Sequence, residues 1–244
     1  MLAPRPRTGL AILVLSLAAA ACSSSSESPA HDAGSGGGTS TSSATTSTGG
    51  GAPSGESCDE ATFVYLNATA QSVLVTGTFA DPPWPSTAAA GALPLTMAAP
   101  GVFVLTTTFA KRDRYLYKFI VDGGSLWAPD PLNPETEPDG TGQGVNSVVN
   151  RYRVFAFSSS AATAVSVTGS FTTPAWSASS AVPLQAVSGF STPVFAAATE
   201  LPAGTQLYKF IVDGGSLWTP DPWNTETQSD GQGGVNSVAQ VCHE

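Results

Sequence analysis

The chain has 244 residues, with 25 glycines, 19 prolines, only 11% charged residues and a formal net charge of −9 at neutral pH. This acidic balance argues against nucleic acid or an anionic lipid surface as the partner. Abundant Gly, Pro, Ser, Thr and Val with little charge favour short strands joined by turns over long helices, so the composition predicts an all-β protein.

Residues 1–21 have the pattern of an export signal peptide. Arg5 and Arg7 supply the positive start, and Leu10–Leu17 form an apolar run that is shorter than the ~20 residues a membrane-spanning helix needs. Cys22 directly follows four alanines, which resembles a bacterial lipoprotein box, where this cysteine becomes the lipidated first residue. We therefore expect a lipoprotein of the bacterial cell envelope, at the outer membrane or cell surface. Ordinary cleavage that yields a secreted protein is the alternative.

The segment of residues 22–57 begins at the expected lipidation site and consists almost entirely of Ser, Thr, Gly and Ala. Such a segment cannot bury enough apolar surface to offset the entropy of ordering, so a disordered, flexible tether is predicted. Cys58 and Cys242 stand at the two edges of the remaining chain. In an exported protein an even pair of cysteines is most simply a disulfide, although the sequence leaves open whether these two are bridged. A bridge would hold their Cα atoms within about 7 Å.

The remaining chain is a tandem repeat, whose parts we name the first module (residues 58–150) and the second module (residues 151–244). LYKFIVDGGSLWAPDP at 116–131 returns as LYKFIVDGGSLWTPDP at 207–222, with fifteen of sixteen positions identical. Units of about 90 residues suit a β-sandwich. In the first module, short runs of β-branched and aromatic residues predict strands at 63–66, 73–75, 102–105, 116–121 and 145–149.

Within the repeated stretch, Gly123-Gly124 predicts a two-residue hairpin loop that pairs Ile120 with Trp127. Side chains alternate along a strand, so one face is uniformly apolar and is expected in the core. This core face carries Tyr117, Phe119, Val121 and Leu126. The opposite face, expected to meet solvent, carries Lys118, Ile120 and Trp127, and in the second module Lys209, Ile211 and Trp218.

An exposed indole beside a lysine has two interpretations. A flat indole stacks well on the apolar face of a pyranose ring, and lysine and asparagine side chains can form hydrogen bonds with the sugar hydroxyls at its rim. The alternative is an indole that only covers the sheet, with the lysine snorkelling over it. The repetition of the whole group of residues in both modules favours a binding site.

The order of motifs around this stretch is a specific one. Gly-Thr-Phe at 77–79 precedes a tryptophan, the Tyr-Lys-Phe-Ile-Val-Asp-Gly stretch, Asp130-Pro131 and Val-Asn-Ser-Val at 145–148. This set resembles the glycogen-binding domain of AMP-activated protein kinase β-subunits and the wider family-48 carbohydrate-binding modules, over residues 60–150 and again over 152–241. The resemblance implies two tandem immunoglobulin-like (early-set) β-sandwiches that bind α-1,4-linked glucan. The sugar-contacting residues it implies are Trp84, Lys118, Trp127 and Asn146 in the first module, and Trp176, Lys209, Trp218 and Asn236 in the second.

Neither module offers the residues of a histidine-based active site. Both histidines, His31 and His243, lie at the margins of the chain, which excludes a histidine triad or a histidine-rich metal site within either module. The aspartates at the predicted turns are expected to cap the backbone, and the glycine-rich loop from Asp139 to Gly144 to lie at the edge of the site. Two carboxylates about 5 to 10 Å apart would suffice for a glycosidase, but two binding-type repeats leave no room for a catalytic domain. We predict no catalytic residue, no cofactor and no metal.

The sequence therefore predicts non-catalytic binding of an α-1,4-linked glucan, of the glycogen or starch type, by two modules on an exported lipoprotein. The expected partner is a polysaccharide or oligosaccharide, with no nucleic acid, and with the membrane reached only through the lipid anchor. The alternative is an envelope protein that uses the sandwiches for protein–protein interaction or as structural modules, without binding sugar.

Overall fold

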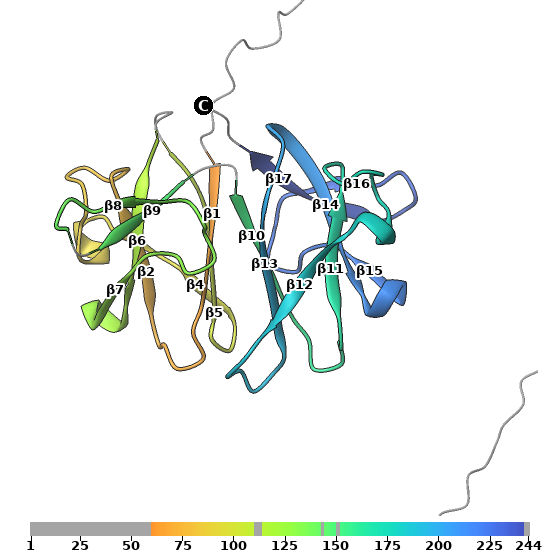
Figure 1. Ribbon diagram of the computed structural model, residues 1–244, viewed down its shortest axis with the longest axis horizontal. Coiled ribbons are helices and arrows are strands. Elements are labelled where there is room, and N and C mark those ends of the chain that lie inside the picture. The colour runs from red at the N-terminus through yellow and green to blue at the C-terminus, as the bar shows by residue number, and fades with distance from the viewer. Residues whose placement is uncertain (1–59, 110–113, 143, 150–151, 242–244) are drawn as a thin grey trace, which may run out of the picture. The chain divides into compact units, whose positions relative to one another are not determined.

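The computed structural model describes residues 60–241 except 110–113, 143 and 150–151 (Figure 1). These residues form antiparallel strands and four single-turn 3₁₀ helices, which confirms the predicted all-β class. In this part of the chain no helix has the length and apolar character to cross a membrane. The predicted signal peptide and tether, the lipidation at Cys22 and the pairing of Cys58 with Cys242 lie outside the described residues, as do both histidines.

The first module forms two sheets, coloured orange to green in Figure 1. The smaller sheet has the order β1-β5-β4, and the larger one β3-β2-β6-β9-β8, with β7 paired to β6. The strands are β1 (Glu60–Leu66), β2 (Val73–Gly77), β3 (Leu93–Pro94), β4 (Thr96–Ala99), β5 (Val102–Thr108), β6 (Leu116–Val121), β7 (Leu126–Ala128), β8 (Thr136–Pro138) and β9 (Val145–Val148). All five strands predicted from the sequence are present, and β7 is the second arm of the predicted hairpin, whereas the short strands β3, β4 and β8 were not predicted.

The second module repeats this arrangement in green-blue to blue. Its strands are β10 (Tyr152–Ser158), β11 (Val165–Gly169), β12 (Val182–Val187), β13 (Val194–Glu200), β14 (Gly204–Val212), β15 (Leu217–Thr219), β16 (Thr227–Ser229) and β17 (Val235–Val241). One difference is that β12 pairs with β11 through its first half and with β13 through its second half. This strand therefore joins what are two sheets in the first module into a single sheet of eight strands.

Each module has its own aromatic core. In the first, Phe119 of β6 is completely buried and packs against Tyr65 of β1, with ring centroids 4.8 Å apart. In the second, Phe210 of β14 packs against Phe157 of β10 at 5.1 Å. Burying a phenylalanine contributes roughly 1.5–3 kcal/mol, so these rings are the main source of stability that joins the sheets.

A buried polar network ties β6, the chain after β7, and β9 together beside this core. The Tyr117 hydroxyl donates to Oδ2 of Asp130 at 2.8 Å, and Nδ2 of Asn133 donates to the Tyr117 oxygen at 3.1 Å. The Asp130 amide donates to Oγ of Ser147 on β9 at 2.7 Å. The second module has the same network, formed by Tyr208, Asn224, Asp221 and Ser237.

The carboxylate in this network titrates at an unusual pH because it is buried. Loss of solvation raises the pKa of Asp130 from 3.8 to about 6, and the same cause raises the pKa of Asp221. The folded state therefore binds a proton between about pH 4 and pH 6 that the unfolded state has released. This contribution to stability is complete below pH 3.8 and is lost as the pH rises through 6.

We predict that Asp130 makes the protein less stable as the pH rises from 4 to 6. The pKa difference corresponds to about 3 kcal/mol of unfolding free energy. The free energy of unfolding of the native protein, measured in urea at pH 4, 5, 6 and 7, should fall by roughly this amount relative to the Asp130→Asn variant. Asp221→Asn should act in the same direction. An identical pH slope in the native protein and the Asp130→Asn variant would contradict the assignment.

Candidate functional site

The register of the larger sheet places the predicted site residues of the first module in one row. Tyr117 and Ser147 face each other in β6 and β9 and are buried in the core, so Lys118 and Asn146 point to the opposite face. Continuing this register by one residue places Lys118 beside Asn146. We name this the outer face. On either side of the row, Thr76 of β2 faces Lys118 and Glu137 of β8 faces Asn146.

The second module has the same row. Tyr208 faces Ser237, so that Lys209 and Asn236 are neighbours on the outer face of β14 and β17. Thr168 of β11 faces Lys209. The residue opposite Asn236 is Gln228, whereas the first module has Glu137 in that place. Both asparagines are almost fully buried, so they offer a ligand only a small edge.

The hairpin that carries the tryptophan has the predicted register but a different loop. Ile120 pairs with Trp127 and Val121 with Leu126, as predicted. The prediction of a two-residue loop is wrong, because β6 ends at Val121 and β7 begins at Leu126, which leaves four residues between them. Asp122 turns away from the hairpin at φ 47° and accepts hydrogen bonds from the amides of Gln71 and Ser72 at 2.8 and 2.9 Å. The aspartate thus caps a neighbouring loop, as expected for a turn aspartate.

The solvent exposure predicted from the two faces is wrong at two positions. Ile120, expected to meet solvent, is only 1% exposed, because it lies between Leu74 and Trp127 on the same face and the indole covers it. Leu126, expected in the core, is 48% exposed, and its counterpart Leu217 is 52% exposed. Each leucine begins a three-residue strand at the turn, beyond the strands that enclose the core.

The two hairpin tryptophans lie against the sheet and the turn but remain partly exposed to solvent. Trp127 and Trp218 are each 39% exposed, although each lies over a buried isoleucine. A Cβ atom built onto Gly124 would lie 3.9 Å from the Trp127 Nε1 atom, and one on Gly215 would lie 3.7 Å from that of Trp218. The indole edge therefore rests against the turn. Each indole lies over the sheet and still exposes part of its surface, which is compatible with either interpretation of the sequence.

The first tryptophan of each module stands in a loop that folds back onto the outer face. The Thr76 hydroxyl, opposite Lys118, donates to the Pro85 carbonyl at 2.8 Å, and the Trp84 amide donates to the Gly77 carbonyl at 3.0 Å. Trp84 has φ 61°, a left-handed conformation that costs a bulky residue roughly 1–3 kcal/mol. The loop bonds hold this strained tryptophan close to the row of polar residues.

The second module has a corresponding loop with the same two hydrogen bonds. The Trp176 amide donates to the Gly169 carbonyl at 3.3 Å, and the Thr168 hydroxyl donates to the Ser177 carbonyl at 3.3 Å. Trp176 is also left-handed, at φ 57°, and its side chain is exposed. The left-handed tryptophan is thus a feature that both modules share, at the same place in the loop.

An ion pair that the sequence did not predict occupies the outer face of each module. Lys118 Nζ lies 3.0 Å from Asp139 Oδ2, and Lys209 Nζ lies 2.6 Å from Asp230 Oδ2. The four side chains are only 13–16% exposed. In both modules the lysine and the aspartate are 21 residues apart, and this shared spacing is the signal from which the pair could have been found.

The glycine-rich loop is folded around this aspartate. Asp139 Oδ1 accepts hydrogen bonds from the amide and hydroxyl of Thr141 at 2.9 and 2.7 Å. Asp230 Oδ1 accepts from the amides of Gln232 and Gly234 at 2.8 and 2.9 Å. A Cβ atom at Gly144 or Gly234 would collide with the carboxylate oxygen that bonds the lysine, which explains the glycine at these two positions.

These hydrogen bonds lower the pKa of both carboxyl groups. The side-chain hydrogen bond from Thr141 is the main cause that lowers the pKa of Asp139 to about 2, with Lys118 contributing. For Asp230 the bond from Lys209 is the main cause, and its pKa is also about 2. Both aspartates are therefore ionised over the whole physiological range, so the lysine on each outer face is neutralised.

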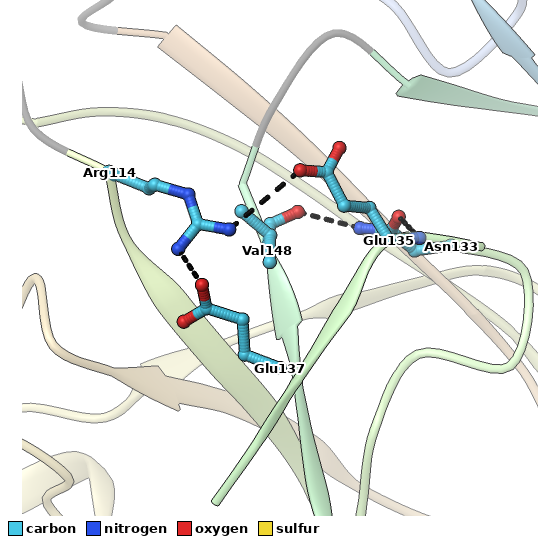
Figure 2. A network of polar contacts seen from close by, with 5 residues as sticks. All are labelled: Arg114, Asn133, Glu135, Glu137 and Val148. Atoms are coloured by element: carbon cyan, nitrogen blue, oxygen red, sulfur yellow. Dashed lines mark hydrogen bonds and ion pairs between the residues drawn. The ribbon is translucent and has the colours of Figure 1, made fainter.

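The two sites differ at the edge formed by β8 and β16. Figure 2 shows that Arg114 donates to Glu137 and approaches Glu135 at 3.8 Å, while Asn133 bonds the Val148 carbonyl. In the second module Thr205 stands in place of Arg114, and its hydroxyl donates to Gln240 at 2.9 Å. The first site is therefore bordered by an arginine and two glutamates, whereas at the second Thr205 and Gln228 replace Arg114 and Glu137, and Glu226 stands in the place of Glu135.

Comparison with known proteins bears on the meaning of this geometry. Residues 151–244 match the family model described as the glycogen recognition site of AMP-activated protein kinase. The predicted family resemblance is confirmed for the second module. The matched residues comprise the whole second module. No curated protein sequence matches the chain.

Solved structures with some similarity to the chain include a pullulanase and a maltogenic amylase. A pullulanase from Anoxybacillus sp. LM18-11 is 10% identical over 75% of this chain and 26% of its own, with a TM-score of 0.28. Its complex with maltotetraose is 11% identical over 75% of this chain and 25% of its own, also with a TM-score of 0.28. A maltogenic amylase from S. marinus is 13% identical over 74% and 28%, with a TM-score of 0.27. The chain thus spans about a quarter of the length of these enzymes.

The close approach at Gly144 gives a direct test of the ion pair. We predict that Gly144→Ala displaces the Asp139 carboxylate and raises its pKa from about 2 toward the ordinary value of 3.8. A pH titration of the side-chain carboxyl resonance by ¹³C NMR measures this change. Gly123→Ala in the β6–β7 turn is the control for an added methyl group away from Asp139, because a Cβ atom there meets nothing within 4 Å, and its φ of 68° makes it a strained substitution whose effect does not involve the Asp139 loop. An unchanged Asp139 pKa in the Gly144→Ala variant would show that the Asp139 carboxylate keeps its bonds without the space beside Gly144.

Proposed function

We propose that each module binds α-1,4-linked glucan without catalysis, on the outer face between the hairpin tryptophan and the lysine–aspartate pair. The observation that carries this proposal is the repeated group itself. In both modules a tryptophan that is 39% exposed shares a sheet face with a paired lysine, and the loop of a second, strained tryptophan folds onto that face. The match of residues 151–244 to a glycogen recognition model supports the choice of ligand.

The chemistry of these groups suits a sugar. The exposed part of Trp127 or Trp218 offers a flat apolar surface to a pyranose ring, and the indole N–H at its edge is a donor. The ammonium of Lys118 or Lys209 supplies further donors and the paired carboxylate supplies acceptors. A sugar hydroxyl is both donor and acceptor, so it can satisfy both members of the pair.

Two sites on one chain favour a polymeric ligand. Once one module has bound a glucan, the second meets the same polymer at an effective concentration in the millimolar range, which can raise avidity by about 10²–10⁴. Weak single sites of modest area are then sufficient. A short oligosaccharide that reaches only one module would be bound far less tightly.

The carboxylates of both modules support binding rather than hydrolysis. Asp139 and Asp230 are paired with lysines, Asp130 and Asp221 are buried against tyrosine hydroxyls, and Asp122 and Asp213 cap backbone amides. A glycosidase needs one carboxyl that is free to donate its proton to the leaving oxygen and a second that attacks or activates water. These six aspartates are all engaged in other contacts.

One observation favours the alternative of a protein partner. Leu126 and Leu217 are the most exposed large apolar side chains at the hairpins, and they occupy the same position in both modules. Exposed leucines next to an exposed tryptophan are also typical of a surface that docks another protein. The two functions use different side chains of the same short strand, so they can be separated by substitution.

Affinity electrophoresis in gels that contain glycogen, amylopectin or a β-glucan tests the choice between these functions. We expect retardation in the two α-glucans and not in the β-glucan. Trp127→Ala together with Trp218→Ala should weaken the retardation about tenfold or more, because the stacking surface is lost. Leu126→Ala with Leu217→Ala is the matched control and should keep it. Absence of retardation in every α-glucan gel would refute glucan binding, and loss of retardation in the leucine variant alone would refute the proposed site.

We also propose that the protein is exported and anchored through a lipid on Cys22. This proposal is based on the signal-like residues 1–21 and on the tether at 22–57 that would separate the modules from a membrane. Labelled palmitate should be incorporated by the native protein in a bacterial host and not by the Cys22→Ser variant. Incorporation that persists in this variant would contradict lipidation at this residue.

A further inference from the structure

The lysine on each outer face does not act as a free positive charge. Within the described part of the chain, each ammonium forms one ion pair, with Asp139 in the first module and with Asp230 in the second. At the edge of the first site, Arg114 pairs with both Glu137 and Glu135. The lysine of each outer face thus belongs to a neutral pair, and the groups at the edge of the first site add no net positive charge.

We propose that Asp139 and Asp230 are specificity residues that make the sites select neutral polysaccharides and exclude anionic ones. This inference rests on the proposed binding of polysaccharide at the outer face. It adds a substrate class, because a lysine beside an indole would otherwise favour sugars that carry carboxylate or sulfate groups.

The carboxylates are positioned by groups other than the lysine. Asp139 is fixed by both donors of Thr141, and Asp230 by two backbone amides of its own loop. An anionic ligand therefore cannot simply replace the carboxylate by rotating it away, since these bonds would be broken as well. Room for the carboxylate is provided by Gly144 and Gly234, where any Cβ atom would collide with it.

The chemistry of the pair explains the selection. A neutral diol can accept from the ammonium and donate to the carboxylate in the same pose, so both members of the pair stay satisfied. A carboxylate or sulfate on the ligand only accepts, and it must approach the aspartate oxygen in order to reach the lysine. The pair is largely screened from water, at 13–16% exposure, so the repulsion between like charges is not removed by solvent. The repulsion between the aspartate and an anionic ligand then provides the specificity.

The test compares two polymers with one backbone, amylopectin and carboxymethylated amylopectin, by affinity electrophoresis of the full chain. The native protein should be retarded by the neutral polymer at least tenfold more strongly than by the anionic one. The Asp139→Asn/Asp230→Asn variant should gain at least tenfold in retardation by the anionic polymer. This gain should disappear in 0.5 M NaCl, since freed lysines at a surface are screened by salt.

Two further variants separate the role of the pair from that of overall charge. Glu60→Gln/Glu200→Gln removes one negative charge from each module, on strands β1 and β13 that do not carry the proposed site, and should gain little. Adding Lys118→Gln and Lys209→Gln to the aspartate variant should abolish its gain. If the asparagine variant loses its cooperative thermal unfolding, Asp139→Ser/Asp230→Ser, which keeps an acceptor oxygen in each loop, is used in its place.

The outcomes distinguish this inference from the proposed function. No gain for the anionic polymer in the folded aspartate variants, or an equal gain in the glutamate control, would overturn the selection. A gain that depends on Lys118 and Lys209, in a protein whose native form binds no neutral glucan, would support the electrostatic selection and refute glucan binding. If the native protein binds amylopectin but the aspartate variants gain no retardation by the anionic polymer, glucan binding is supported and the electrostatic selection is refuted.

Discussion

The structure of each module depends on one strand and its register. Strand β6 pairs with β2, β7 and β9, and β14 pairs with their counterparts in the second module. Because side chains alternate, the same register that buries Tyr117 and Phe119 places Lys118 on the outer face. A slip by one residue would expose the aromatic core and bury the lysine. The burial of the aromatic side chains therefore fixes the orientation of the site residues. A substitution that keeps the strand register keeps both the core and this orientation.

The buried tyrosine network carries this constraint to the chain beyond the central strand. The Tyr117 hydroxyl holds Asp130, and Asp130 bonds Ser147, which stands next to Asn146 in β9. Strand β8 pairs with β9 and leads directly into the loop of Asp139. The aspartate that neutralises Lys118 is thus positioned through β9 and β8 from the same core residue that precedes Lys118. Both members of the ion pair are brought together by one rigid arrangement, which reduces the entropy lost in holding them.

The sequence predicted this arrangement where local rules decide it. The repeat, the strand runs and the alternation in LYKFIV are enough to place the central strands and the pairing of Ile120 with Trp127. It did not predict the burial of Ile120, since alternation says which face a side chain takes and not whether a neighbouring indole covers that face. It also did not predict the Lys118–Asp139 pair, because the contact crosses from β6 to a loop after β8. Such a contact follows from tertiary structure, although its recurrence 21 residues apart in both modules was visible.

The differences between the modules indicate which features have to be kept. Around the first site, Arg114 joins two glutamates, and around the second the corresponding contact is a neutral bond of Thr205. In both loops the carboxylate accepts from the amide two residues further on, and its second bond comes from the Thr141 hydroxyl in one loop and from the Gly234 amide in the other. The edges and part of the support have thus diverged, while the tryptophan, the lysine and its paired aspartate are the same. An ion pair near the surface of a protein adds little to stability, so folding alone gives weak reason for both modules to keep this one while its surroundings differ. A requirement on the ligand that the outer face accepts accounts for the pair in both modules.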